Sequence, residues 1–258
     1  MKTKSLLLNL AVCFLLLNVC ISPPAFGGRI DLIVGHGVDK EAEAQARATV
    51  DGVFNFFQKT YGIGLQKDIR INLSCDKHSY KKAIMSEYGR SEASAARTAN
   101  RSVGLQLGGT LLVDLGDSSR RNFKLFTLCH EIVHFYQAQE SQDKHGSIDW
   151  ICEGVAEVLA AHIMETVGKQ SPGYWKEYWR EGLKDARDWP RLENLHSSMG
   201  APFAYDTSAL AVLTLVEWRG YPALFAYFRN LKNSSPEDAF YRAFGTRLSD
   251  FEKQFKPF

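Results

Sequence analysis

The segment from Leu125 to Phe135 most constrains the fold, because it is apolar on nearly every side and yet carries three groups that can hold charge. A helix that is hydrophobic all round is a buried helix. Its apolar members are Leu125, Phe126, Leu128, Ile132, Val133 and Phe135. The sequence HEIVH adds His130, Glu131 and His134. Burying two imidazoles and a carboxylate without partners costs several kcal/mol. We therefore expect a divalent cation to satisfy them together.

The spacing of these three residues fits a metal site. Residues four apart lie on one face of a helix, so His130 and His134 can share one ion. Glu131 then lies beside that ion, where a base for a metal-bound water has to be. The alternative is a pair of hydrogen-bonded core histidines, because a motif this short also occurs by chance.

The segment DWICEGVAEVLAAH, residues 149–162, supplies the other acidic candidates. Catalytic zinc takes three protein ligands and keeps one open position. Eighteen residues separate His134 from Glu153, which is enough for a helix end, a loop and a return in a second helix. Glu157 follows one turn later on the same face, where it can receive an imidazole N–H from a ligating histidine. The alternative is an exposed acidic pair, but the apolar neighbours of both glutamates favour burial.

The pattern HExxH, eighteen residues, then WxxEGxAE resembles the gluzincin branch of zinc metallopeptidases, and most of all the small bacterial peptidase MA-like domains. The tail from Tyr205 to Phe255 is similar to the closing helices of that family. The resemblance implies one zinc ion held by His130, His134 and Glu153, with Glu131 as general base. It also implies Tyr205 as the donor that stabilises an oxyanion.

Two points near this motif stay open. The sequence itself permits His196 or Tyr178 in the oxyanion role as well as Tyr205. Cys152 stands where relatives often carry a small or polar residue.

The remaining pattern predicts an α+β fold, and the resemblance implies that this fold is zincin-like. The stretch 39–62 is rich in helix formers, 68–75 alternates like a strand, 79–89 returns to helix, and 102–116 is typical of a strand or hairpin. From Asn122 onward the sequence predicts helices interrupted at Gly146, 172–173, 189–190, 220–222 and Pro236. We expect a single domain over 28–258. Its α/β part (28–121) carries a small mixed sheet, its helical part (122–258) carries the zinc site, and the active-site cleft lies between them.

Residues 1–27 have the layout of a secretory signal peptide, with cleavage near Gly27–Gly28 and a secreted or periplasmic product. An uncleaved membrane anchor is the alternative. Residues 28–258 contain 29 basic and 29 acidic residues, so neither a nucleic-acid partner nor stable membrane insertion is expected after processing. Three cysteines remain, Cys75, Cys129 and Cys152. At least one of them must be free, and a Cys129–Cys152 bridge is sterically possible.

These features together predict an exported, zinc-dependent metallohydrolase that cleaves a peptide or protein substrate. The strand GLQLGGTLL is the natural place for a peptide to add by edge pairing. Two alternatives remain open. One is an amidase that uses the same zinc site on a non-protein amide, such as a cell-wall cross-link. The other is a non-catalytic binding module that zinc stabilises.

Overall fold

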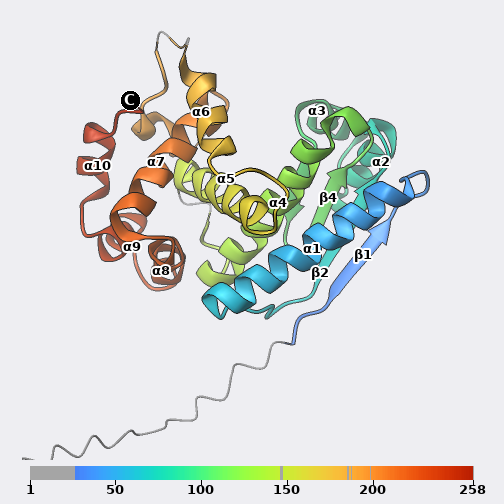
Figure 1. The fold of residues 1–258 in the computed structure, drawn as a ribbon, viewed down its shortest axis with the longest axis horizontal. Coiled ribbons are helices and arrows are strands. Elements are labelled where there is room, and N and C mark those ends of the chain that lie inside the picture. Colours follow the sequence, from blue (N-terminus) through green and yellow to red (C-terminus); the bar gives the residue numbers. More distant parts are fainter. Residues whose placement is uncertain (1–26, 146–147, 185, 187, 198, 258) are drawn as a thin grey trace, which may run out of the picture.

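The computed structural model describes residues 27–145, 148–184, 186, 188–197 and 199–257 (Figure 1). Apart from Gly27, the predicted signal peptide lies outside these residues. Within them, no helix combines the length and the apolar character needed to cross a membrane. The architecture is α+β, with a sheet in the N-terminal half and a helical C-terminal half, as predicted.

The sheet contains β1 (Ile30–Val34), β2 (Ile69–Ser74), β3 (Gly104–Leu107) and β4 (Thr110–Asp114), in the order β1-β2-β4-β3. β1, β2 and β4 run parallel, while β3 pairs antiparallel with β4 and forms one edge. The predicted strand or hairpin at 102–116 is therefore a β3–β4 hairpin, which turns at residues 108–109. Edge strand β1 was not predicted.

Helices cover both faces of this sheet. Because side chains alternate along a strand, Leu111 and Val113 of β4 join the main core together with α1 (Lys40–Tyr61) and α4 (Arg121–Ser141). Leu112 between them belongs to a second core cluster with Tyr80 and Ile84. That cluster lies under α2 (Lys77–Tyr88) and α3 (Glu92–Arg101), of which α3 was not predicted.

The helical half contains α5 (Asp149–Thr166), α6 (Tyr174–Lys184), α7 (Ala204–Arg219), α8 (Pro222–Leu231), α9 (Pro236–Phe244) and α10 (Leu248–Gln254). Helices end or begin at the predicted breaks around 172–173, 220–222 and Pro236, and Gly245 adds a break between α9 and α10. The predicted break at Gly146 falls outside the described residues.

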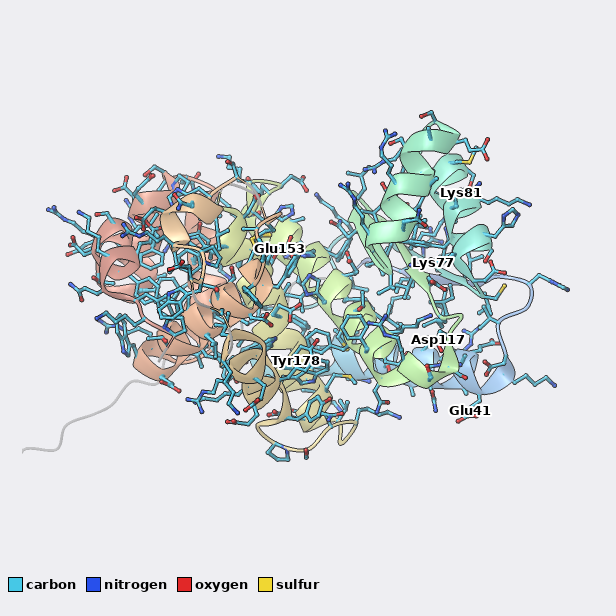
Figure 2. The ribbon with its side chains drawn as sticks, turned by 90° about the horizontal axis from the view of Figure 1, so that it is seen from above. Glu41, Lys77, Lys81, Asp117, Glu153 and Tyr178 are labelled. Carbon is cyan, nitrogen blue, oxygen red and sulfur yellow. The ribbon has the colours of Figure 1, made fainter. Side chains whose placement is uncertain are left out.

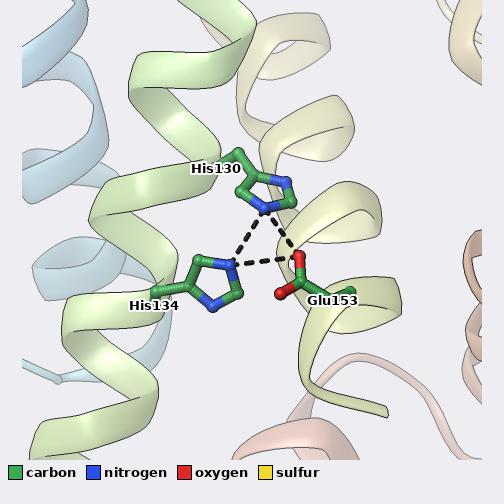
Figure 3. A group of neighbouring side chains, drawn as sticks. All are labelled: His130, His134 and Glu153. Atoms are coloured by element: carbon green, nitrogen blue, oxygen red, sulfur yellow. Dashed lines mark hydrogen bonds and ion pairs between the residues drawn. The ribbon is translucent and has the colours of Figure 1, made fainter. Parts of the chain in front are cut away.

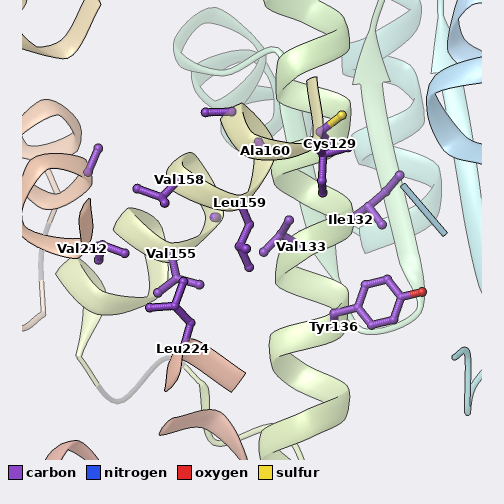
Figure 4. Packing of buried hydrophobic residues seen from close by; sticks show 14 of the residues in the cluster. Cys129, Ile132, Val133, Tyr136, Val155, Val158, Leu159, Ala160, Val212 and Leu224 are labelled. Atoms are coloured by element: carbon purple, nitrogen blue, oxygen red, sulfur yellow. The ribbon is translucent and has the colours of Figure 1, made fainter. Parts of the chain in front are cut away.

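Helix α4 is buried, as its apolar character predicted. Every residue from Leu128 to Ser141 is buried. One side of the helix packs toward the sheet, and the other packs against α5 through Val133 and Leu159, with Val212 of α7 and Leu224 of α8 beyond (Figure 4). The two histidines therefore sit in the middle of the molecule, at the junction of its halves.

Gly154 explains how closely α5 and α7 approach each other. A Cβ atom at this position would lie 2.5 Å from the carbonyl oxygen of Ser208, a separation that real Cβ atoms do not adopt. The glycine that follows Glu153 thus sets the depth at which α5 sits against α7. It thereby helps to place Glu153 opposite α4.

Candidate metal centre

Three nitrogen and oxygen atoms from two helices converge on one point (Figure 3). Nε2 of His130 lies 2.9 Å from Nε2 of His134 and 3.1 Å from Oε2 of Glu153, and the remaining separation, from His134 to Glu153, is 3.4 Å. Helix α4 supplies both histidines because they are four residues apart, and α5 supplies the glutamate. The three residues form a possible metal-binding triad.

The triangle has the size that a tetrahedral cation requires. Ligand atoms at about 2.0–2.1 Å from a zinc ion stand about 3.3 Å from one another, close to the three separations found here. The donor set is two imidazole nitrogens and one carboxylate oxygen, and both histidines are buried. Buried groups of this kind are normally neutralised by partners, and one divalent cation at the centre of the triangle would serve all three.

The other ring nitrogen of each histidine touches an acceptor. Nδ1 of His130 lies 3.0 Å from Oε1 of Glu157, at ion-pair distance but without the alignment of a directed hydrogen bond. Nδ1 of His134 lies 2.9 Å from Oε1 of Gln137. Because an amide oxygen can only accept, the His134 proton belongs on Nδ1 and leaves the Nε2 lone pair for a cation.

The sequence predicted one part of this outer layer, Glu157, but not Gln137 or Trp179. Glu157 was expected beside a ligating histidine, and the structure places it beside His130. Its second oxygen, Oε2, accepts the indole N–H of Trp179 from α6 at 3.1 Å. Gln137 also donates from Nε2 to the carbonyl oxygen of Cys152 at 2.8 Å. Gln137 could have been found from its position one turn after His134, whereas nothing local links Trp179 to Glu157.

The protonation of the triad reflects burial working against opposite charges. Burial lowers the pKa of His130, but the hydrogen bond to Glu153 and the close carboxylate of Glu157 outweigh it and raise the pKa to about 9. Burial also opposes charge on His134, yet the charge of Glu153 raises its pKa well above the usual value. For Glu153, burial is outweighed by His134 and His130, so its pKa falls well below the usual range. The carboxylate is therefore ionised, as a metal ligand must be.

Glu131 lies on the side of α4 that faces β3. It is buried, and burial raises the pKa of its carboxyl, against the opposing charges of His130 and His134. The backbone N–H of Gln106 opposes this rise in pKa as well, though less than the two histidines. A Cβ atom at Gly104 would lie 2.8 Å from Oε1 of Glu131, so any larger residue at the start of β3 would require this carboxylate to shift. Glu131 is thus held between the triad and the edge strand.

A cavity of about 760 Å³ opens over the triad between the two halves of the chain. Its α/β side includes Gly104 and Gln106, and its helical side includes Tyr178 and Tyr205. Both tyrosines are roughly half exposed, because the cleft is open to solvent. Burial and the nearby Glu153 raise the pKa of Tyr205, which keeps its phenol neutral and able to donate. The predicted cleft is therefore present.

The third oxyanion candidate, His196, lies elsewhere. It pairs with Glu252 of α10, and both line a separate pocket beside Arg247. Tyr205 and Tyr178 therefore remain as the two tyrosines that line the cavity over the triad.

Cys75, Cys129 and Cys152 are free, so the possible Cys129–Cys152 bridge is not formed. The Cys152 thiol instead donates to Oε1 of Gln137 at 3.0 Å and lies 3.5 Å from Nδ1 of His134. Cys152 is 6% exposed, and burial raises its pKa. It is therefore a neutral neighbour of the histidine that Gln137 orients.

Comparisons with known proteins give no identity that this site could inherit. No family model matches the chain, and no curated protein matches it. What the site does must be inferred from its own residues.

Proposed function

We propose that the protein is a zinc-dependent hydrolase that cleaves peptide bonds. One observation carries the proposal. Nε2 of His130, Nε2 of His134 and Oε2 of Glu153 converge within zinc-ligand spacing at the floor of an open cleft. The carboxylate of Glu131, which is not part of this cluster, lines the same cleft. A purely structural zinc site uses four protein ligands and needs no adjacent base, so this arrangement favours turnover over the binding-module alternative.

Zinc is the cation that this donor set favours, because two imidazoles and one carboxylate make up a common catalytic zinc site. A zinc ion bound there supplies a Lewis acid that polarises a carbonyl and makes water nucleophilic at neutral pH. His130, His134 and Glu153 would hold the ion from the helices, and the cavity lies on its other side. Glu157 and Gln137 keep the two imidazoles turned so that Nε2 points inward.

Glu131 moves the protons. Its carboxylate takes one proton from the attacking water as the new carbon–oxygen bond forms, and returns it to the leaving nitrogen as the carbon–nitrogen bond breaks. Burial shifts the pKa of Glu131 upward, toward neutral pH, which suits a group that must both accept and release a proton.

The walls of the cleft bind and orient the substrate. β3 is an edge strand whose outer side is not paired with any described strand, so an extended peptide can add there through main-chain hydrogen bonds. The phenol of Tyr205 or of Tyr178 can donate to the oxygen that gains charge as water attacks. Such a donor contributes most when it is aimed at the position of the developing charge.

We further propose export, on the basis of the signal-peptide pattern at residues 1–27. Mass spectrometry of the exported protein should then show an N-terminus close to Gly28. A chain that keeps residues 1–27 in the membrane fraction would show that they form an anchor.

The hydrolase proposal is tested by Glu131→Gln, which preserves size and removes basicity. Hydrolysis should fall by about 10²–10⁴-fold while zinc content and folding stay normal. Glu41→Gln is the matched control, because Glu41 is exposed on α1 and lies far from Glu153 (Figure 2). It should change nothing. A folded, zinc-loaded wild-type protein that hydrolyses no member of a peptide library would refute the peptidase proposal and direct the search to non-protein amides.

A further inference from the structure

Positive charge is concentrated on the two helices at one side of the cleft. Residues 28–258 contain 29 cations and 29 acids, yet residues 76–101, which form α2 and α3, contain six lysines and arginines against three acids. All three acids are already engaged. Asp76 caps α2 by accepting from Ser79, Glu87 pairs with Arg70, and Glu92 pairs with Lys81. The excess positive charge therefore faces solvent or substrate.

Three cations from this side line the cavity above the triad: Lys77, Arg101 and Arg120, here called the basic lip. Figure 2 shows Lys77 across the cleft from Glu153. Lys77 already contacts Asp114 and the carbonyl oxygen of Ser102. The guanidinium groups of Arg101 and Arg120 form no ion pair with any carboxylate among the described residues, and both residues are exposed.

The surroundings of Arg120 keep its charge available. Its guanidinium lies 4.9 Å from the ring centre of Phe123, an arrangement that holds the cation without neutralising it. The nearest acid in the sequence, Asp117, accepts instead from the backbone and hydroxyl of Ser119.

Arg101 lies close to Glu131, and so close to the bond that would be cleaved. Arg101 ends α3 three residues before Gly104, against which Glu131 packs. Three extended residues span about 10 Å, which is also the length of about three residues of an extended substrate. Arg101, and Lys77 through its contact with the Ser102 carbonyl oxygen, thus lie toward the end of β3 where the strand begins, while the other end carries the exposed Leu107. A peptide paired along β3 would meet positive charge on one side of its scissile bond.

We propose that the basic lip selects peptides that carry Asp or Glu side chains on one side of the scissile bond. This rests on the proposed peptidase function. The helical wall of the cavity disfavours a negative charge, because it holds the carboxylates of Glu157 and Asp206 together with two neutral tyrosines. A substrate carboxylate placed there would be repelled, whereas at the lip it can pair with Arg101 or Arg120.

The experiment uses peptide pairs that differ only by Glu→Gln on either side of the cleaved bond. Hydrolysis is measured with the zinc-loaded protein, and binding is measured by fluorescence polarisation with the zinc-loaded Glu131→Gln variant. Exposed ion pairs are individually weak, so we expect about a threefold to tenfold preference for Glu on one side only. Arg101→Gln and Arg120→Gln should each reduce it, and the double variant and high salt should abolish it. Arg242→Gln, an exposed arginine of α9 away from the cleft, is the matched control and should preserve it.

The outcomes separate the two proposals. Equal hydrolysis and equal binding of the Glu and Gln peptides would overturn the acidic preference and leave the peptidase intact. A preference that survives in the double variant would show that other residues select the charge, and would also overturn the inference. Tight, lip-dependent binding of Glu peptides without any hydrolysis would support the inference and refute the peptidase.

Discussion

Trp179 donates its indole N–H to Oε2 of Glu157 across 3.1 Å, and the other oxygen of that carboxylate lies 3.0 Å from Nδ1 of His130. Helix α6 therefore reaches a candidate metal ligand through one carboxylate on α5. The groups that touch the outer nitrogen of a ligating histidine set its orientation and basicity. Trp179 is thus placed to act on the metal site as a positioning residue, without touching it.

Removing this indole N–H should weaken zinc binding. We expect Trp179→Phe, which keeps an aromatic ring in place, to raise the zinc dissociation constant by about 10-fold, the lower end of the effect of outer partners. Trp175→Phe is the matched control, because Trp175 is buried on the same helix and its Nε1 has no hydrogen-bond partner among the described residues. Competition with a zinc chelator measures both variants. Equal losses of zinc affinity in the two variants would show that the packing of the ring, and not the indole N–H, is responsible.

The stability of the metal-stripped protein should fall as the pH rises. The pKa of His130 is raised to about 9, above its unfolded value of about 6.5. The contribution of His130 to the free energy of unfolding is therefore complete below about pH 6.5 and is lost as the pH rises through about 9. The pKa of His134 is shifted in the same direction. Zinc displaces these protons, so zinc affinity should rise over the same range.

Urea unfolding of the chelator-treated protein at about pH 6, 8 and 9.5 measures this effect. Glu153→Gln removes the carboxylate charge that holds both protons and should flatten the decline. A wild-type unfolding free energy that stays level or rises with pH would contradict the described electrostatics.

Gly154→Ala should destabilise the fold by about 1–3 kcal/mol, the usual effect of adding a methyl group to a well-packed interface. The new Cβ would meet the Ser208 carbonyl oxygen at 2.5 Å, so α5 and α7 must separate. Because Glu153 is adjacent, zinc affinity should fall together with stability. Chemical unfolding and chelator competition measure the two effects, and a variant as stable as the wild type would disprove this reason for the glycine.

Those parts of the site that depend on spacing within one helix could be predicted from the sequence. His130 and His134 share a face because they are four residues apart, and the same holds for Glu153 and Glu157. The apolar surroundings of both pairs predicted two buried helices that pack against each other. The meeting of the two pairs then followed from the need of buried polar groups for partners.

The contacts that were not predicted join elements far apart in the chain. Trp179 lies within the aromatic segment YWKEYWR, residues 174–180, which is typical of packing, and only the tertiary fold brings its N–H to Glu157. Edge strand β1 is a short stretch whose place in the sheet depends on parallel pairing with β2, thirty-nine residues along the chain. The basic lip likewise combines the start of α2, the end of α3 and the start of α4, which lie too far apart in the sequence to form a local motif.

The zinc content of the purified protein, compared with that of Glu153→Ala, tests the central claim most directly. Three ligands on a preformed site predict about one zinc per chain in the wild type, and much less than one in the variant, because it loses a ligand. A wild-type protein that purifies without zinc and cannot be loaded with it would contradict the account.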